Sequence, residues 1–316
     1  MQPKKKLLLK TMNNHQSGES LIEFLIVLSI GLFIIAGAYK LLLIGKKEMD
    51  YQMAQTDLMQ SELIAEYQLQ TAVSNVGVAS CGQVASLLSY KNLTRDSAAR
   101  LRLAQGTAVQ VFTMDEAEAQ ALELDKPGSG QAIADTDVLI VRRASGRATL
   151  QEGASKDAES IIISNGLRFK ADQIIVISDC QHLVSDRITG VWRHKNQQEI
   201  ELEQPLGFTF KIGAVASHYE FEAYYIGKTL RKNALGKTIT ALYVQDTRST
   251  RHELIPNLSG LKITAWLKPY QKPGWYQPIN TIEDWTLLKG LQITLKLQSE
   301  DHSILRQGHL MLSWNE

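Results

Sequence analysis

Apolar and polar positions divide the chain into three regimes. Residues 1–18 are polar and basic, residues 21–44 form a nearly unbroken apolar run, and an amphipathic pattern follows from about residue 45. The apolar run is long enough to span a bilayer. No proline lies between Pro3 and Pro127, so no strong helix breaker interrupts this region. The pattern predicts one helix from Glu19 to about Val76, with a membrane half over residues 19–44 and an amphipathic half after it.

The amphipathic half carries an apolar stripe at helical spacing. Residues of one stripe lie on one face of a helix, so we expect that face to pack on the globular body. Gly77 and Gly82 bracket the expected end of the helix segment, which we place at residues 19–79. The stripe consists of Met59, Leu63, Tyr67, Ala72, Val73 and Val76.

Residues 80–316 have the pattern of a β-rich domain, with one candidate short helix over Asp115–Leu124. The predicted fold class is therefore α+β, with the amphipathic half-helix against an antiparallel sheet. Eight short apolar or alternating runs predict strands: Val109–Phe112, Val138–Val141, Ile161–Ile163, Ile174–Ile177, Phe221–Ile226, Ile239–Val244, Leu261–Leu267 and Leu291–Leu297.

Charge is distributed unevenly along the 316 residues. The first 18 residues hold four of the 34 Lys and Arg side chains and none of the 33 acids, so the remainder has 30 basic and 33 acidic side chains. Bulk charge therefore argues against nucleic acid as a partner. The N-terminal lysines favour a cytoplasmic N-terminus, which places residues after about Ile44 on the other side of the membrane.

The junction between the basic leader and the apolar run admits several interpretations. Ser20 and Glu23 fit a capping box at a helix start. The same region fits a secretory signal peptide cleaved after Ala36-Gly37-Ala38, or a plain single-pass anchor. Glu23 argues against the signal peptide because it places a carboxylate at the start of the apolar core. Apolar character also continues past Ala38 to Ile44.

Gly18, Glu23 and the apolar run that begins at Phe24 together resemble the class III signal of type IV prepilins. The resemblance implies cleavage by a prepilin peptidase after Gly18, which makes Glu19 the first mature residue. Glu19 stands where the family usually has Phe or Met, and this departure bears on N-methylation of that residue. The resemblance also implies that Glu23 acts in assembly, by compensating the α-amino group of a neighbouring subunit.

Further segments resemble, in order, the PilW branch of minor pilins. These are Gly77–Cys81 after the helix, Thr136–Arg142 at a strand start, Ile177–Cys180 at a strand end, Tyr224-Tyr225-Ile226, Leu242-Tyr243 and Glu253-Leu254-Ile255. Cys81 and Cys180 are the only cysteines. As residues alone they fit two buried thiols, and an extracytoplasmic body favours a Cys81–Cys180 disulfide.

The resemblance implies a minor pilin that helps to prime pilus assembly within a tip or minor-pilin subcomplex. Implied partners are other minor pilins, the major pilin, the prepilin peptidase, the inner-membrane assembly platform and, before assembly, membrane lipid. The implied location is the inner membrane in a single pass, then the filament at the cell surface. Two alternatives stay open: a J-type minor pseudopilin of type II secretion, and a membrane-tethered periplasmic binding or adhesion module.

The chain shows no motif for catalysis, cofactor or metal binding, so we expect no enzyme. One aromatic and proline-rich segment, residues 266–278, has two interpretations. It is either a hairpin whose aromatics pack on their own sheet, which we favour, or a partner contact surface. Its candidate contact residues are Trp266, Lys268, Tyr270, Lys272, Trp275 and Tyr276.

Overall fold

The structure is a computed structural model. It describes residues 21–74, 76, 89–92, 109–116, 122–179, 181–233, 235–268, 273–279, 282, 288–299 and 304–313. The chain divides into two compact units, residues 1–53 and residues 54–316.

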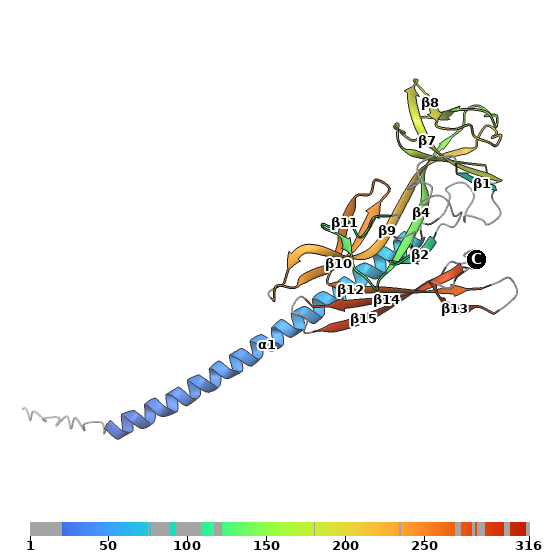
Figure 1. The fold of residues 1–316 in the computed structure, drawn as a ribbon. Helices are drawn as coiled ribbons and strands as arrows, with labels where there is room; N and C mark the ends of the chain where they lie inside the picture. Colours follow the sequence, from blue (N-terminus) through green and yellow to red (C-terminus); the bar gives the residue numbers. More distant parts are fainter. Residues whose placement is uncertain are drawn as a thin grey trace, which may run out of the picture. The chain divides into compact units, whose positions relative to one another are not determined.

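The N-terminal element is one long helix, α1 (Leu21–Ser74), of 54 residues (Figure 1). At 1.5 Å per residue its length is roughly 80 Å. It continues through Gly31, Gly37 and Gly45, where an added Cβ would meet nothing within 4 Å. These glycines therefore lower helix propensity without breaking the hydrogen-bond ladder. The predicted helix is confirmed over these residues, with an end at Ser74 in place of Val76.

The larger sheet of the second unit has eleven strands among the described residues, in the central order β11-β10-β9-β6-β7-β8-β5 (Figure 1). β4 pairs with β9 and β2, and β3 pairs with β9, all antiparallel. β1 pairs with β7 in parallel. The bounds are β1 Ser89–Asn92, β2 Val109–Thr113, β3 Gln131–Ala132, β4 Asp137–Thr149, β5 Ser160–Ser164, β6 Ile174–Ser178, β7 His182–Arg193, β8 Gln197–Leu202, β9 Val215–Lys232, β10 Thr238–Asp246 and β11 Arg251–Pro256.

A second sheet has four antiparallel strands in the order β13-β12-β14-β15. Apolar residues on alternate positions of β12 and β14 give it one buried face, as period-two alternation requires. All eight predicted strands are found in the two sheets. The bounds are β12 Leu258–Leu267, β13 Trp275–Pro278, β14 Leu288–Gln298 and β15 Leu305–Ser313.

The C-terminal part of α1 packs against both sheets in one hydrophobic core. Its buried residues meet β2 and β4 of the larger sheet and the buried face of β12 and β14. The helix approaches β15 closely at Gly308, where an added Cβ would lie 2.5 Å from the Glu62 carboxylate. Glu62 forms an ion pair with Arg306 at that crossing. The buried helix residues are Leu58, Ala65, Leu69, Ala72 and Val73.

The predicted packing face of the helix is wrong at three of its residues. Met59, Leu63 and Tyr67 are 46%, 65% and 67% exposed, whereas Ala72 and Val73 are buried as predicted. The buried stripe includes Leu58, Ala65 and Leu69. Met59, Leu63 and Tyr67 lie on the opposite face of the helix.

One further region, the predicted short helix, differs from the prediction. The described ends of the predicted helix over residues 115–124 are turns, at Asp115–Glu116 and residues 122–125, and residues 117–121 lie outside the described part.

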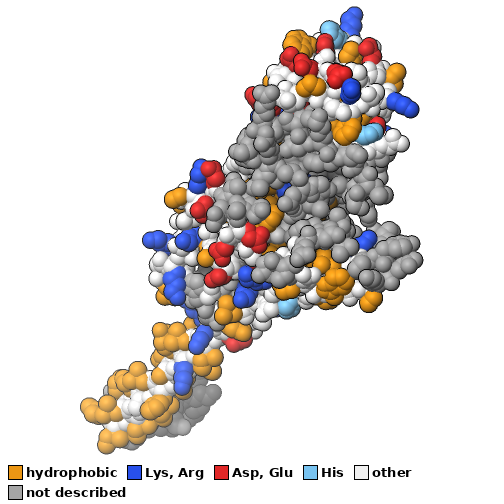
Figure 2. Space-filling view, turned by 45° about the vertical axis from the view of Figure 1, so that its right-hand side comes forward, with side chains coloured by type: hydrophobic (Ala, Val, Ile, Leu, Met, Phe, Trp, Pro, Cys, Tyr) orange, Lys and Arg blue, Asp and Glu red, His pale blue; other side chains and the backbone are white. Residues whose placement is uncertain are grey.

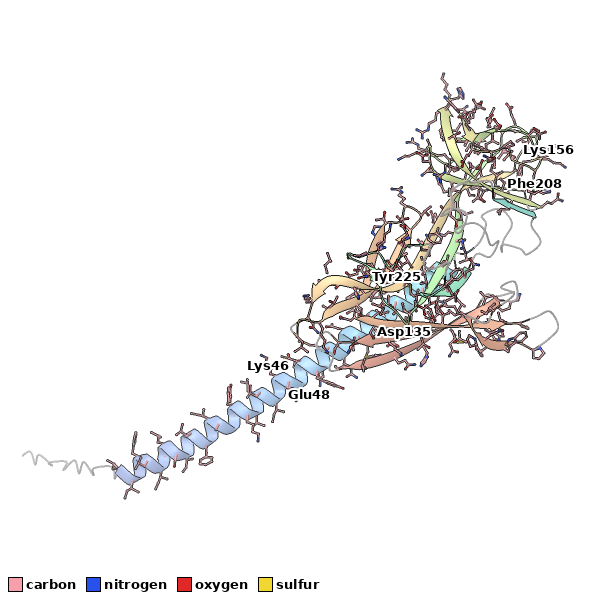
Figure 3. All side chains as sticks on the ribbon, viewed as in Figure 1. Lys46, Glu48, Asp135, Lys156, Phe208 and Tyr225 are labelled. Carbon is pink, nitrogen blue, oxygen red and sulfur yellow. The ribbon has the colours of Figure 1, made fainter. Side chains whose placement is uncertain are left out.

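A second core lies on the other side of β9. Tyr225 is buried there, and its ring centroid lies 6.2 Å from that of Tyr243 (Figure 3).

Asp137 links the two sheets where β4 begins. Its side chain is buried, and Oδ2 accepts a hydrogen bond from the N–H of Ile263 in β12 (2.7 Å). Oδ1 accepts a hydrogen bond from Lys262 Nζ (3.1 Å). The neighbouring Thr136 hydroxyl donates to the carbonyl of Leu261 (3.3 Å). The Asp135-Thr136-Asp137 sequence is therefore a connection between sheets.

Candidate assembly and contact surfaces

The start of α1 contains Glu23, the predicted assembly residue. Glu23 lies in the first turn, and its side chain is exposed. A carboxylate there interacts favourably with the positive end of the helix dipole. Gly18 and Glu19, the predicted cleavage residues, and Ser20 of the capping box lie outside the described residues. The structure thus places Glu23 at the helix start and leaves its partner as a prediction.

The first unit presents an uncovered apolar surface. Its described residues, 21–53, include none that is buried, and α1 is long and apolar enough to cross a membrane, as an anchor or as a signal sequence. Figure 2 shows hydrophobic side chains across the visible face of this segment. Lys46 and Glu48 mark the return of charge after the apolar run (Figure 3). An apolar surface of this extent needs lipid or other apolar helices to cover it.

Within the second unit, α1 also has an exposed face without charge. We call this the outward stripe. Its side chains lie about 120–220° around the helix from the buried Ala65, taking 100° per residue. The three acids of this helix segment, Asp57, Glu62 and Glu66, lie outside that sector. The outward stripe consists of Thr56, Met59, Gln60, Leu63, Tyr67, Gln70 and Ser74.

The outward stripe has the composition of a helix-packing surface. Met59, Leu63 and Tyr67 expose large apolar side chains at spacings of four residues. Uncharged Thr, Gln and Ser fill the positions between them. Such a stripe packs well against a second helix, whereas exposure of its large apolar side chains to water is unfavourable.

The two cysteines, Cys81 and Cys180, lie outside the described residues, so their predicted disulfide stays a prediction. The residues around Cys180 form a tight turn after β6. Asp179 Oδ1 accepts hydrogen bonds from the N–H groups of Gln181 (3.0 Å) and His182 (2.7 Å). Burial acts to raise the pKa of Asp179, but these hydrogen bonds outweigh it and the pKa lies below its usual value.

The aromatic segment at residues 266–278 forms a hairpin of β12 and β13. Trp266 is partly covered, and Gly274 approaches its ring so closely that an added Cβ would lie 2.6 Å from Trp266 Nε1. Trp275 and Tyr276 are 43% and 52% exposed. The hairpin interpretation thus suits Trp266, whereas the other two aromatics are accessible to a partner. Lys268 is partly exposed, and Tyr270 and Lys272 lie outside the described residues.

Two arginines of the body, Arg143 and Arg251, form contacts within it. Arg143 pairs with Glu220 (2.5 Å) and Glu222 (2.8 Å) across β4 and β9. Burial acts to raise the pKa of Glu220, but the hydrogen bonds from Ser145 and Arg143 lower the pKa by more, so the net shift is downward. Arg251 donates to backbone carbonyls of the 123–130 loop.

The described residues contain no group of three or more His, Cys, Asp or Glu side chains that could hold a metal ion. Asp186, whose pKa burial raises to about 6, accepts hydrogen bonds from the N–H groups of Arg187 and Gln204 and is fully buried. A hollow of about 540 Å³ lined by residues 153–155 and 209–212 has one ionisable side chain, Lys211.

Comparison with known proteins adds no family to this description. No family model, no curated protein and no solved structure matches the chain.

Proposed function

We propose that this chain is a minor pilin of the PilW type, a structural subunit that helps to prime type IV pilus assembly. One observation carries the proposal: α1 has an uncovered apolar half followed by a half with an exposed, charge-free outward stripe. The first surface suits lipid before assembly and neighbouring helices afterwards. Partners of the proposed subunit are other pilins and the inner-membrane assembly platform.

The outward stripe favours an assembling subunit over a simple tethered module. A tether needs an apolar segment only where it crosses the bilayer. Here Leu63 and Tyr67, in the unit that carries the globular body, expose about two thirds of their surfaces. A J-type pseudopilin of type II secretion requires the same helix surfaces and is the closest alternative.

Processing of the N-terminus tests the proposal. Removal of residues 1–18 from the 316-residue chain leaves 298 residues beginning at Glu19. Intact mass of the membrane-extracted protein is expected to show this species when the prepilin peptidase is present. Gly18→Leu is expected to abolish it, because a bulky side chain does not fit a site that accepts glycine. A mature N-terminus at Tyr39 would instead establish a secretory signal peptide.

Glu23→Ala is expected to reduce incorporation into filaments or minor-pilin complexes about tenfold. In the proposed assembly the carboxylate compensates the α-amino group of a neighbouring subunit in an apolar bundle, and loss of one member leaves an unpaired charge. Quantitative immunoblotting of sheared filaments measures incorporation. The matched control is Glu48→Ala, which removes an exposed carboxylate beyond the apolar run. Normal incorporation of Glu23→Ala would leave this residue only a role at the helix start.

A further inference from the structure

The four strands that end the two sheet paths differ in how well they resist addition of another strand. In the larger sheet, β5 has five residues, and β11 has six with a register shift against β10 and three charged or titratable residues at its start. In the smaller sheet, β13 has four residues and ends in Pro278. Short length, charge, bulges and proline are the usual means by which proteins block edge pairing.

The fourth of these strands, β15, has almost none of these protections. It is nine residues long and pairs with β14 in unbroken register from Leu305 to Ser313. It contains no proline, lysine or acid. Its one arginine, Arg306, is paired with Glu62 of α1. Among the described residues, β14 is the only strand that pairs with it, so its other edge offers backbone donors and acceptors.

The charge of the smaller sheet indicates what kind of strand fits beside β15. None of its four strands contains aspartate or glutamate. Its solvent face carries Lys296, His309 and Lys262, the last also bonded to Asp137. Exposed Leu305 and Met311 lie at the two ends of β15 on that face. Pairing of two copies of β15 would bring together two faces that hold lysines and no acid, whereas an acidic strand would complement those lysines.

We propose that β15 is a docking edge to which an extended, acidic segment of a different subunit adds as a fifth strand. Backbone hydrogen bonds along nine residues supply the binding energy, and acids on alternate positions of the incoming strand select the partner through His309 and Lys296. The inference rests on the proposed function for the nature of the partner. It adds a contact made by the body to the contacts made by the helix.

Site-specific photo-crosslinking in cells that carry the complete assembly system tests the inference. A benzophenone amino acid replaces Gln307, His309 or Met311 in the full chain, and cross-linked peptides are mapped by mass spectrometry. Leu63 in the outward stripe serves as the reporter of assembly, and His252 on β11 serves as the control edge. The three β15 positions are expected to react with one acidic segment of another subunit, at sites that advance by two residues per step.

Two substitutions of His309 that differ in charge test whether the partner strand is acidic. His309 is exposed, so substitution there leaves the core intact. His309→Glu is expected to lower the cross-link yield from Gln307 about threefold, since like charges across a strand pair are unfavourable. His309→Lys is expected to keep or raise it. Equal losses in both variants would contradict an acidic partner.

The outcomes separate this inference from the proposed function. Cross-links from Leu63 without any from β15 would overturn the docking edge and leave the pilin proposal standing. Cross-links from β15 to a second copy, or to another segment of the same chain, would also overturn it. Loss of cross-links at Leu63 and at β15 together would count against the filament subunit itself.

Discussion

Leu69→Ala is expected to lower the free energy of unfolding by about 3 kcal/mol, whereas Tyr67→Ala is expected to change it by less than about 0.5 kcal/mol. The two residues are two positions apart on α1, but Leu69 is fully buried and Tyr67 is 67% exposed. Leu69 packs in the core shared by the helix and both sheets, so its truncation leaves a cavity. Denaturant unfolding of the full chain in detergent measures the difference.

Binding of other pilin subunits is expected to depend on the exposed residues of α1 more than on the buried ones. Leu63→Ala with Tyr67→Ala removes the two most exposed apolar side chains of the outward stripe and is expected to reduce co-purification of other pilin subunits at least tenfold. Gln60→Ala with Gln70→Ala is the matched control, because it alters the same face without removing a large apolar group. A double variant of Leu63 and Tyr67 that loses stability but binds normally would show that the stripe packs within this chain.

Sequence pattern predicted the long helix well because its signal is extended. Residues 21–44 are apolar almost throughout, and no proline follows before Pro127. The packing face was missed because hydropathy favours Met59, Leu63 and Tyr67 over Ala65. The buried face is set by contacts that are distant in sequence, since Glu62 meets Arg306 and Gly308 of β15, more than 240 residues away. A one-dimensional pattern contains no information about that contact.

The strands that were missed carry polar residues at buried positions. β7 contains Ser185 and Asp186, both nearly inaccessible, and β8 contains buried Gln198. These side chains break the alternation by which strands are recognised. Their burial is tolerated because Asp186 is bonded to backbone N–H groups on two segments. In β15 a glycine and an arginine occupy the inner face, so the strand most relevant to docking has the weakest apolar pattern.

Candidate contact residues differ in how far local sequence can identify them. Glu23, Trp275 and Tyr276 were predicted because charge in an apolar run and clustered aromatics are local signals, and their contacts stay predictions. Met59, Leu63 and Tyr67 of the outward stripe were predicted to pack on the globular body, and they are exposed instead. Which face of a helix is free depends on the rest of the fold, and only the position of the two sheets against Leu58 and Leu69 reveals it.

Asp137→Ala is expected to lower the free energy of unfolding by about 3 kcal/mol. The substitution leaves the Ile263 N–H buried without its acceptor, and it removes the side-chain link between β4 and β12. Asp137→Asn keeps a carbonyl oxygen for that N–H and is expected to cost about 1 kcal/mol. The bond to Lys262 contributes little to either value, because half of the lysine side chain is exposed.

The pH dependence of the free energy of unfolding, compared between the wild type and Asp137→Asn, tests whether burial or hydrogen bonding dominates at Asp137. Burial raises the pKa of Asp137, and the opposing hydrogen bonds from Ile263 and Lys262 do not cancel that effect. The folded chain therefore binds this proton more tightly than the unfolded chain, so stability from this group falls as pH rises from about 4 through the folded pKa. Acidification from pH 7 to pH 4 is expected to widen the advantage of the wild type over Asp137→Asn, measured by denaturant unfolding at each pH. A narrowing advantage would show that the hydrogen bonds, and not burial, dominate at this junction.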